Sequence, residues 1–172
     1  VAQAIYDHYK PVGGDDSIPS SLTGLVVALA DKVDTLRGCF SVGLVPTGSR
    51  DPFALRRAAQ GVVRILVEGR LPLKLSQLLG DDKQLHEFLR DRISHYFRDV
   101  RGFRYDEVNA VLAAGADDLV DVAQRLEAIR AVRPTEDFEP VAASFKRIQN
   151  ILTQAKFTSG TAVSELLTEE PE

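Results

Sequence analysis

Residues 46–57 read PTGSRDPFALRR, a cluster of turn-forming residues that leads directly into a helical pattern. Asp51 stands immediately before Pro52, where an N-cap carboxylate can accept the free N–H groups of a first helical turn. Proline at the first helical position loses no hydrogen bond, because that N–H has no partner inside a helix. The sequence therefore predicts that a helix begins just after Asp51.

The predicted helix, residues 52–68, has an apolar face and a polar face at helical spacing. The apolar face consists of Leu55, Ala59, Val62 and Leu66. The polar face consists of Arg57, Gln60, Arg64 and Glu68. This pattern predicts a buried helix with a basic ridge, and Arg56 adds a further positive charge beside it.

The same periodicity predicts helices along the rest of the chain, at residues 1–9, 22–40, 106–113, 118–132 and 137–156, with another between Asp82 and Gly102. In the helix at 22–40 the expected core stripe is Leu22, Val26, Leu29, Val33, Leu36 and Phe40. Only residues 39–45, CFSVGLV, resemble a strand, and Gly43 within them weakens that interpretation. The expected fold is all-α, and a boundary is expected near Gly80.

The net charge of −4 argues against a non-specific nucleic-acid binder, which needs clustered Lys and Arg. The charge is unevenly distributed, however. Residues 50–70 carry five arginines against two acids, and residues 88–104 again carry five against two, whereas residues 106–139 have nine acids against three arginines. Such a chain can bind RNA locally.

The chain has no apolar run near the roughly 20 residues of a membrane span and no secretory signal pattern, and it contains a single cysteine, Cys39. One cysteine excludes an internal disulfide and agrees with a reducing cytoplasm, which is the expected location. Because the chain begins without Met and inside a predicted helix, we interpret it as a fragment of a longer protein.

Five segments together resemble a known family. PTGSRDPFALRR is preceded by AIYDHYKP at 4–11 and ALADKVDTLRGCFSVG at 28–43, and is followed by GFRYDEVNAVLA at 102–113 and FKRIQNIL at 145–152. These segments closely resemble the C-terminal half of the beta subunit of bacterial tetrameric glycyl-tRNA synthetase. The resemblance covers nearly the whole chain, and we identify the chain as a C-terminal fragment of such a subunit.

The resemblance implies two regions. Residues 1–80 would form the C-terminal part of an HD-like helical domain with a connecting helix, and residues 81–172 a truncated, DALR-like anticodon-binding domain. It also implies a partner alpha subunit, in an alpha2–beta2 assembly, that activates glycine with ATP and Mg, together with tRNA(Gly) as the bound substrate. No catalytic residue, metal or cofactor is expected in this fragment, and neither DNA nor membrane is an expected partner.

A few residues could take part in metal binding or nucleophilic chemistry, but each also has an ordinary structural role. His8 and Asp31 are the candidate ligands of an HD-type site, but such a site needs several convergent donors that this chain lacks. Asp31 can equally form salt bridges on its helix. Cys39 next to Phe40 is typical of a small core residue. The turn before Asp51 could receive a phosphate, yet the Asp51 carboxylate would occupy that helix end.

RNA binding is the remaining chemical hypothesis. On the last helix the polar side presents Lys146, Arg147, Asn150 and Thr153, which can reach phosphates and unstacked base edges. The second basic block supplies Arg98, Arg101 and Arg104, with Tyr96, Phe103 and Tyr105 as candidates for stacking on bases. Arg56, Arg57 and Arg64 would contact tRNA or another subunit.

Two alternatives stay open at this stage. Amphipathic helices normally carry solvated charges, so the chain could be a helical scaffold that joins subunits without touching RNA. It could also be the remnant of an HD-type metal-dependent phosphohydrolase. Salt-dependent tRNA binding would distinguish the first alternative, and metal-dependent phosphate release would identify the second.

Overall fold

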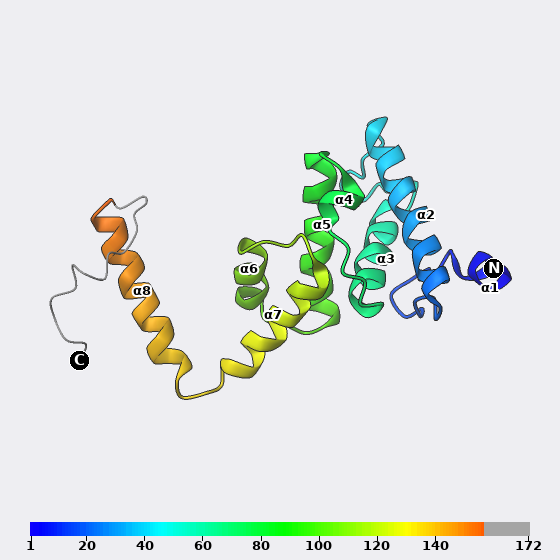
Figure 1. The fold of residues 1–172 in the computed structure, drawn as a ribbon. Coiled ribbons are helices and arrows are strands. Elements are labelled where there is room, and N and C mark those ends of the chain that lie inside the picture. The colour runs from blue at the N-terminus through cyan, green and yellow to red at the C-terminus, as the bar shows by residue number, and fades with distance from the viewer. Residues whose placement is uncertain (157–172) are drawn as a thin grey trace. The chain divides into compact units, whose positions relative to one another are not determined.

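The computed structural model describes residues 1–156, which fold into helices joined by turns and loops (Figure 1). The elements are α1 (Ala2–Asp7), α2 (Leu22–Ser41), α3 (Leu55–Glu68), α4 (Leu75–Leu79), α5 (Lys83–His95), the π-helical segment η1 (Tyr96–Val100), α6 (Tyr105–Ala113), α7 (Leu119–Val132) and α8 (Phe138–Gln154). Within residues 1–156 there is no strand, and the β-type pairing is limited to two isolated bridges. The all-α prediction is confirmed.

The chain divides into two compact units, residues 1–130 and the part that begins at Ala131. The first unit contains one continuous hydrophobic core, to which α2 to α7 all contribute. Helices on both sides of Gly80 therefore share this core. A shared core does not test whether residues 1–80 and 81–172 belong to two family domains, and that assignment stays a prediction.

α3 lies at the centre of the first unit, beside α2 and packed against α5 (Figure 1). Val62, Val63, Ile65 and Leu66 are completely inaccessible to solvent, so α3 is apolar on more than one side. A helix with this pattern belongs in a core. Burying each such side chain stabilises the fold by about 1.5–3 kcal/mol.

The start of α3 differs from the prediction. Helical geometry begins at Leu55 rather than Pro52, because Ala54 has a left-handed conformation (φ 54°). Asp51 nevertheless caps the helix from this distance. Its Oδ1 accepts the N–H of Leu55 at 2.8 Å and its Oδ2 accepts the N–H of Arg56 at 3.0 Å. The capping carboxylate was predicted correctly and the helix boundary was not.

The core stripe predicted for α2 is wrong in the first turns of the helix. Leu22 is 66% exposed and Val26 is half exposed, whereas Leu25 and Ala28 are buried. The predicted stripe advanced by alternating steps of four and three residues, a 3.5-residue period. A straight helix repeats every 3.6 residues, so such a stripe drifts off the face that packs on α3.

The helix predicted between Asp82 and Gly102 is present, but it changes its winding. Asp82 caps α5 by accepting the N–H of Leu85 at 3.0 Å. At Tyr96 the helix passes into the π-helical segment η1, and Gly102 leaves helical geometry at φ 68°. A π-helical turn inserts an extra residue and so shifts which side chains face the core. Tyr96 and Phe97 are both buried as a result.

α8 differs from the other long helices in having no buried residue. Its apolar stripe is exposed, with Phe145 at 70% and Ile148 at 52%. None of the helices in the described range is long and apolar enough to cross a membrane.

Candidate nucleic-acid interface

The three arginines of α3 that the sequence singled out lie in different environments. The side chain of Arg57 is exposed and makes no hydrogen bond or ion pair within residues 1–156. Arg56 is half-buried and donates to the carbonyl of Gly48 at 2.6 Å. Arg64 is 8% exposed, although its place on the polar face predicted a solvated position.

Arg64 is buried because the loop after α1 lies over it. Its Nη1 donates to the carbonyls of Gly13 and Gly14 at 3.1 and 3.0 Å, while Nε and Nη2 donate to the two carboxylate oxygens of Glu68. The hydrogen bond to Glu68 raises the pKa of Arg64. Tyr96 of η1 also donates to Glu68, at 3.2 Å. These contacts give Arg64 a structural role that joins the loop, α3 and η1.

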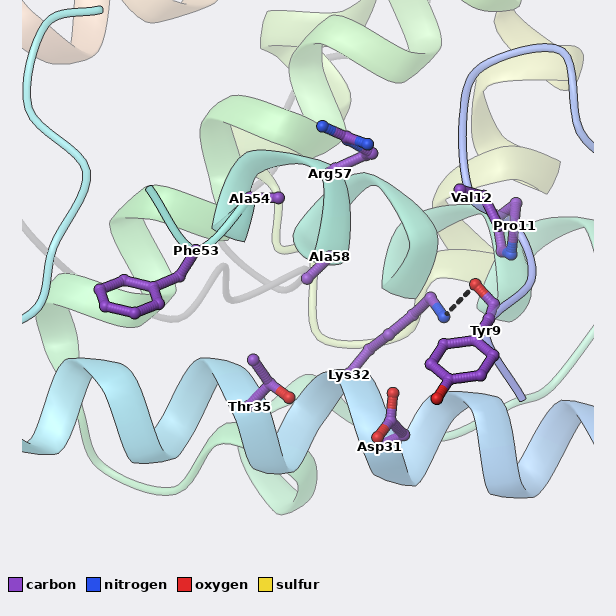
Figure 2. Close-up of a pocket in the computed structure, with 10 residues that line it drawn as sticks. All are labelled: Tyr9, Pro11, Val12, Asp31, Lys32, Thr35, Phe53, Ala54, Arg57 and Ala58. Carbon is purple, nitrogen blue, oxygen red and sulfur yellow. Dashed lines mark hydrogen bonds between the residues drawn. The ribbon is translucent and has the colours of Figure 1, made fainter. Parts of the chain in front are cut away.

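A cavity of about 290 Å³ lies where the loop after α1, α2 and the start of α3 meet (Figure 2). Lys32 of α2 crosses it, and its Nζ donates to the carbonyls of His8 and Tyr9 at 3.2 and 3.1 Å. Burial lowers the pKa of Lys32. Since this ammonium group is already bound by backbone carbonyls, its charge serves the fold. Arg57, at the rim, has no such partner among residues 1–156.

Arg57 also lines a second cavity, of about 340 Å³, which we call the arginine cavity. Its charged and titratable lining residues are Asp51, Arg56, Arg57 and Arg64 around α3, and Arg92 and His95 on α5. Sequence analysis missed Arg92 because it is distant along the chain from the other arginines. Its position in the basic block at 88–104 was the only signal, and the packing of α3 on α5 could not be foreseen.

In the second basic block, residues 88–104, one arginine contacts an exposed aromatic ring. The Arg98 guanidinium lies 5.4 Å from the centroid of the Tyr105 ring, which is 66% exposed. Arg101 forms an ion pair with Glu127 at 3.0 Å, and Arg104 forms one with Asp106 at 3.4 Å. Arg98 itself forms a longer ion pair with Asp99 at 3.9 Å. Arg98 and Tyr105 are therefore brought together, and all three arginines have a carboxylate neighbour, closest for Arg101 and Arg104.

The other two aromatic residues of this block cannot stack on RNA. Tyr96 is 1% exposed and Phe103 is 4% exposed, so the expectation that they receive bases is wrong. Phe103 is covered by Arg130, whose guanidinium carbon lies 3.6 Å from the ring centroid. Both rings are core residues, and each packs edge to face against the buried ring of Phe97.

α8 presents Lys146, Arg147 and Asn150 to solvent. Within residues 131–156 these side chains make no hydrogen bond or ion pair. Thr153 differs, because its hydroxyl donates to the carbonyl of Gln149 at 2.8 Å. Asn150 is exposed rather than packed, so its amide is available to a ligand.

The candidate metal ligands are not assembled into a site. Within residues 1–156 no group of three or more His, Cys, Asp or Glu side chains is placed to hold a metal ion. His8 instead contacts the carbonyl of Ile5 through Nδ1, and its ring lies against Tyr9. Cys39 is partly buried against the core, as a small apolar residue would be.

Comparison with known proteins gives a consistent picture. The family model described as glycyl-tRNA synthetase beta subunit matches residues 1–113. A glycine–tRNA ligase beta subunit from Acidobacterium capsulatum is 50% identical over 96% of this chain, and those from Leptothrix cholodnii and an Acidovorax species are 46% and 45% identical over 99% and 100% of it. The chain spans about a quarter of the length of these relatives, 25%, 26% and 25% respectively. The match covers more than half of the chain, and the chain therefore belongs to the family of glycyl-tRNA synthetase beta subunits.

Proposed function

We propose that this chain is a tRNA-binding portion of a glycine–tRNA ligase beta subunit. In this proposal it positions and recognises tRNA(Gly) while the alpha subunit, in an alpha2–beta2 assembly, forms the aminoacyl bond with ATP and Mg. The fragment supplies no catalytic residue, metal or cofactor. Residues 1–80 would belong to the HD-like region and residues 81–172 to the anticodon-binding region.

The free polar surface of α8 is the observation that supports this proposal most. Lys146 and Arg147 lie four and three residues before Asn150, so all three occupy neighbouring positions on one side of the helix. Two cations beside an amide combine phosphate binding with the reading of a base edge. Since no group of residues 131–156 competes for these donors, the second unit leaves them available to RNA.

Arg98 and Tyr105 are the second part of the proposed interface. The guanidinium covers part of the Tyr105 ring and leaves it 66% exposed, so the ring can still stack on an unpaired base. Arg101 and Arg104 contribute less in this proposal, because Glu127 and Asp106 already neutralise them.

Salt titration of tRNA binding by the full-length protein tests the proposal on α8. We expect Lys146→Ala and Arg147→Ala to weaken binding of all tRNAs about equally, and to reduce the salt slope by about 0.7–0.9 each, because one counterion fewer is released. Asn150→Ala should reduce the preference for tRNA(Gly) and leave the slope unchanged. Gln149→Ala, an adjacent exposed amide, is the matched control.

A helical scaffold without RNA contact is the second candidate, and the apolar stripe of α8 favours it. Val141, Phe145 and Ile148 are each more than half exposed, and such surface commonly marks a protein interface. The chain spans about a quarter of the length of its relatives, and in this candidate function another part of the complete subunit covers the stripe. Folded α8 variants that all bind tRNA as the wild type does would favour this second candidate.

A further inference from the structure

The arginine cavity contains more positive charge than its own carboxylates neutralise. Four arginines line it, together with the carboxylate of Asp51. Both Asp51 oxygens accept backbone N–H groups of α3, and Glu68 pairs with Arg64. Arg57 and Arg92 consequently have no carboxylate partner among the described residues.

Arg92 is the most unusual residue of the cavity. Its Nε is shielded from solvent and has no hydrogen-bond acceptor within residues 1–156. The guanidinium lies 5.9 Å from the centroid of the Phe88 ring, which holds it in place without satisfying its donors. A buried donor without an acceptor destabilises the fold, and native structures normally have a reason for one. An acceptor brought by a ligand would provide that reason.

The lining residues indicate the kind of ligand. Guanidinium groups donate parallel pairs of N–H bonds that match the oxygens of a phosphate. Gln60 adds a neutral amide, and among residues 1–156 the lining contains one ring, that of His95, and no Tyr, Phe or Trp. Four guanidinium groups beside a single small ring favour recognition of a phosphate group over reading of a base.

We infer that the arginine cavity between α3 and α5 binds a phosphate of the tRNA backbone, with Arg57 and Arg92 as the groups that contact it. This inference rests on the proposed function, since RNA is the phosphate ligand that a tRNA-binding subunit meets. It adds a contact in the first unit that does not involve α8 and is independent of sequence. Arg64 positions the loop at the edge of the cavity through Gly13 and Gly14.

The test is tRNA binding by the full-length protein as KCl is varied, with Arg57→Gln, Arg92→Gln and the double substitution. Each single change should weaken tRNA(Gly) and other tRNAs alike, and should lower the salt slope by about 0.7–0.9, with the double change lowering it about twice as much. Arg37→Gln is the matched control, because Arg37 is exposed on α2, makes no ion pair within residues 1–156 and lines neither cavity. It should leave the slope unchanged.

A second arm identifies the source of the phosphate. At equal ionic strength, inorganic phosphate should compete with tRNA more strongly than chloride does in the wild type, and this excess should disappear in the double variant. If phosphate raises the melting temperature of the wild type alone while tRNA binding is identical in all variants, the cavity binds a small phosphate compound and the RNA assignment is wrong.

The remaining outcomes separate this inference from the proposed function. Wild-type tRNA binding with an unaltered slope in the folded Arg57 and Arg92 variants would overturn the inference and leave the proposed function intact. Absence of tRNA binding by the wild type would overturn both. The Arg57 side chain makes no hydrogen bond or ion pair within residues 1–156, so Arg57→Gln decides the question even if Arg92→Gln lowers the melting temperature.

Discussion

Asp51 shows how one side chain determines where a central helix begins. Its two oxygens accept the N–H groups of Leu55 and Arg56, which have no acceptor inside α3. The turn that carries it is closed by its own hydrogen bonds between Thr47 and Arg50, in both directions. The carboxylate thus fixes a polar turn to the most buried helix of the first unit.

Replacing this carboxylate should measurably destabilise the fold. We expect Asp51→Ala to lower the free energy of unfolding by roughly 0.5–2 kcal/mol, the usual range for a lost N-cap. Urea unfolding followed by circular dichroism measures the change. Asp34→Ala, at an exposed position of α2, is the control and should cause no loss. Equal stability of the Asp51 variant and the wild type would contradict the capping role.

The side chain of Lys32 fills the space next to the Gly61 Cα of α3. A Cβ at this position would lie 2.7 Å from Cε and 2.9 Å from Cδ of Lys32, whose Nζ is held by two carbonyls. Gly61→Ala should therefore destabilise the fold by about 1–3 kcal/mol, because hydrogen bonds to a charged group are lost. The same unfolding measurement checks it.

Gly38→Ala is the matched control for that substitution. Gly38 also lies within a helix, but a Cβ added there would meet no neighbouring side chain of residues 1–156 within 4 Å. Here alanine should stabilise the fold by up to about 1 kcal/mol through helix propensity. An equal gain at both glycines would mean that the Lys32 side chain moves aside at no cost.

At the scale of elements, the short helix α4 is held by a loop distant in sequence. Asp117 accepts the N–H of Ser76 at 2.8 Å and its hydroxyl at 3.0 Å, and the N–H of Leu75 donates to the Asp117 carbonyl. The backbone hydrogen bond from Ser76 is the main cause that lowers the pKa of Asp117 below its ordinary value of 3.8. The link between α4 and the start of α7 is thus strongest when this carboxyl is ionised.

The sign of the resulting pH dependence follows from that lowered pKa. A carboxyl with a lower pKa in the folded state stabilises the fold above its unfolded pKa of 3.8, and this contribution is lost as the pH falls through the folded value. Because Asp117 is exposed and its charge is screened by water, Asp117→Asn should be less stable than the wild type at pH 7 by only roughly 0.2–1 kcal/mol. The difference should shrink below about pH 4.

Unfolding of the wild type and Asp117→Asn between pH 3 and pH 7 checks this expectation. Asp91→Asn, on the exposed side of α5, controls for the removal of a carboxylate as such. A stability difference for Asp117 that does not change with pH would show that the charge is irrelevant to the contact.

The elements themselves could largely be predicted, because helical periodicity and caps are local properties. Asp82 and Asp51 identified two helix starts, but the left-handed Ala54 and the π-helical turn at Tyr96 have no sequence signature that separates them from regular helix. Burial was harder to foresee. The sequence predicted that Arg64 is solvent-exposed, but the Gly13–Gly14 loop lies over it. It also predicted that Phe103 could stack on a base, but the Arg130 guanidinium covers the ring.

In the candidate site, too, local properties could be predicted from the sequence and tertiary contacts could not. The free donors of α8 were visible as the polar side of an amphipathic helix, and their exposure agrees with that pattern. The convergence of Arg57 with Arg92 depends on how α3 packs against α5, which is a tertiary contact. Charge blocks along a sequence thus indicated the relevant region, and only the packing showed which arginines share a cavity.

At the scale of the whole molecule, tRNA binding and protein contact make different demands on α8. Its polar side carries free donors and its apolar stripe is exposed, so both a ligand and a protein surface can be accommodated at once. A helix with no buried residue has little tertiary protection, and its backbone amides should exchange quickly when nothing covers them. Amide exchange therefore reports directly on what binds there.

Hydrogen–deuterium exchange of the full-length protein, with and without tRNA(Gly), is the most direct test of the central claim that this region binds tRNA. The account predicts that tRNA slows exchange in peptides covering α8 and residues 98–105, and that added salt reverses the effect. Exchange unchanged by tRNA throughout residues 1–156, in a protein that demonstrably binds tRNA, would contradict the claim.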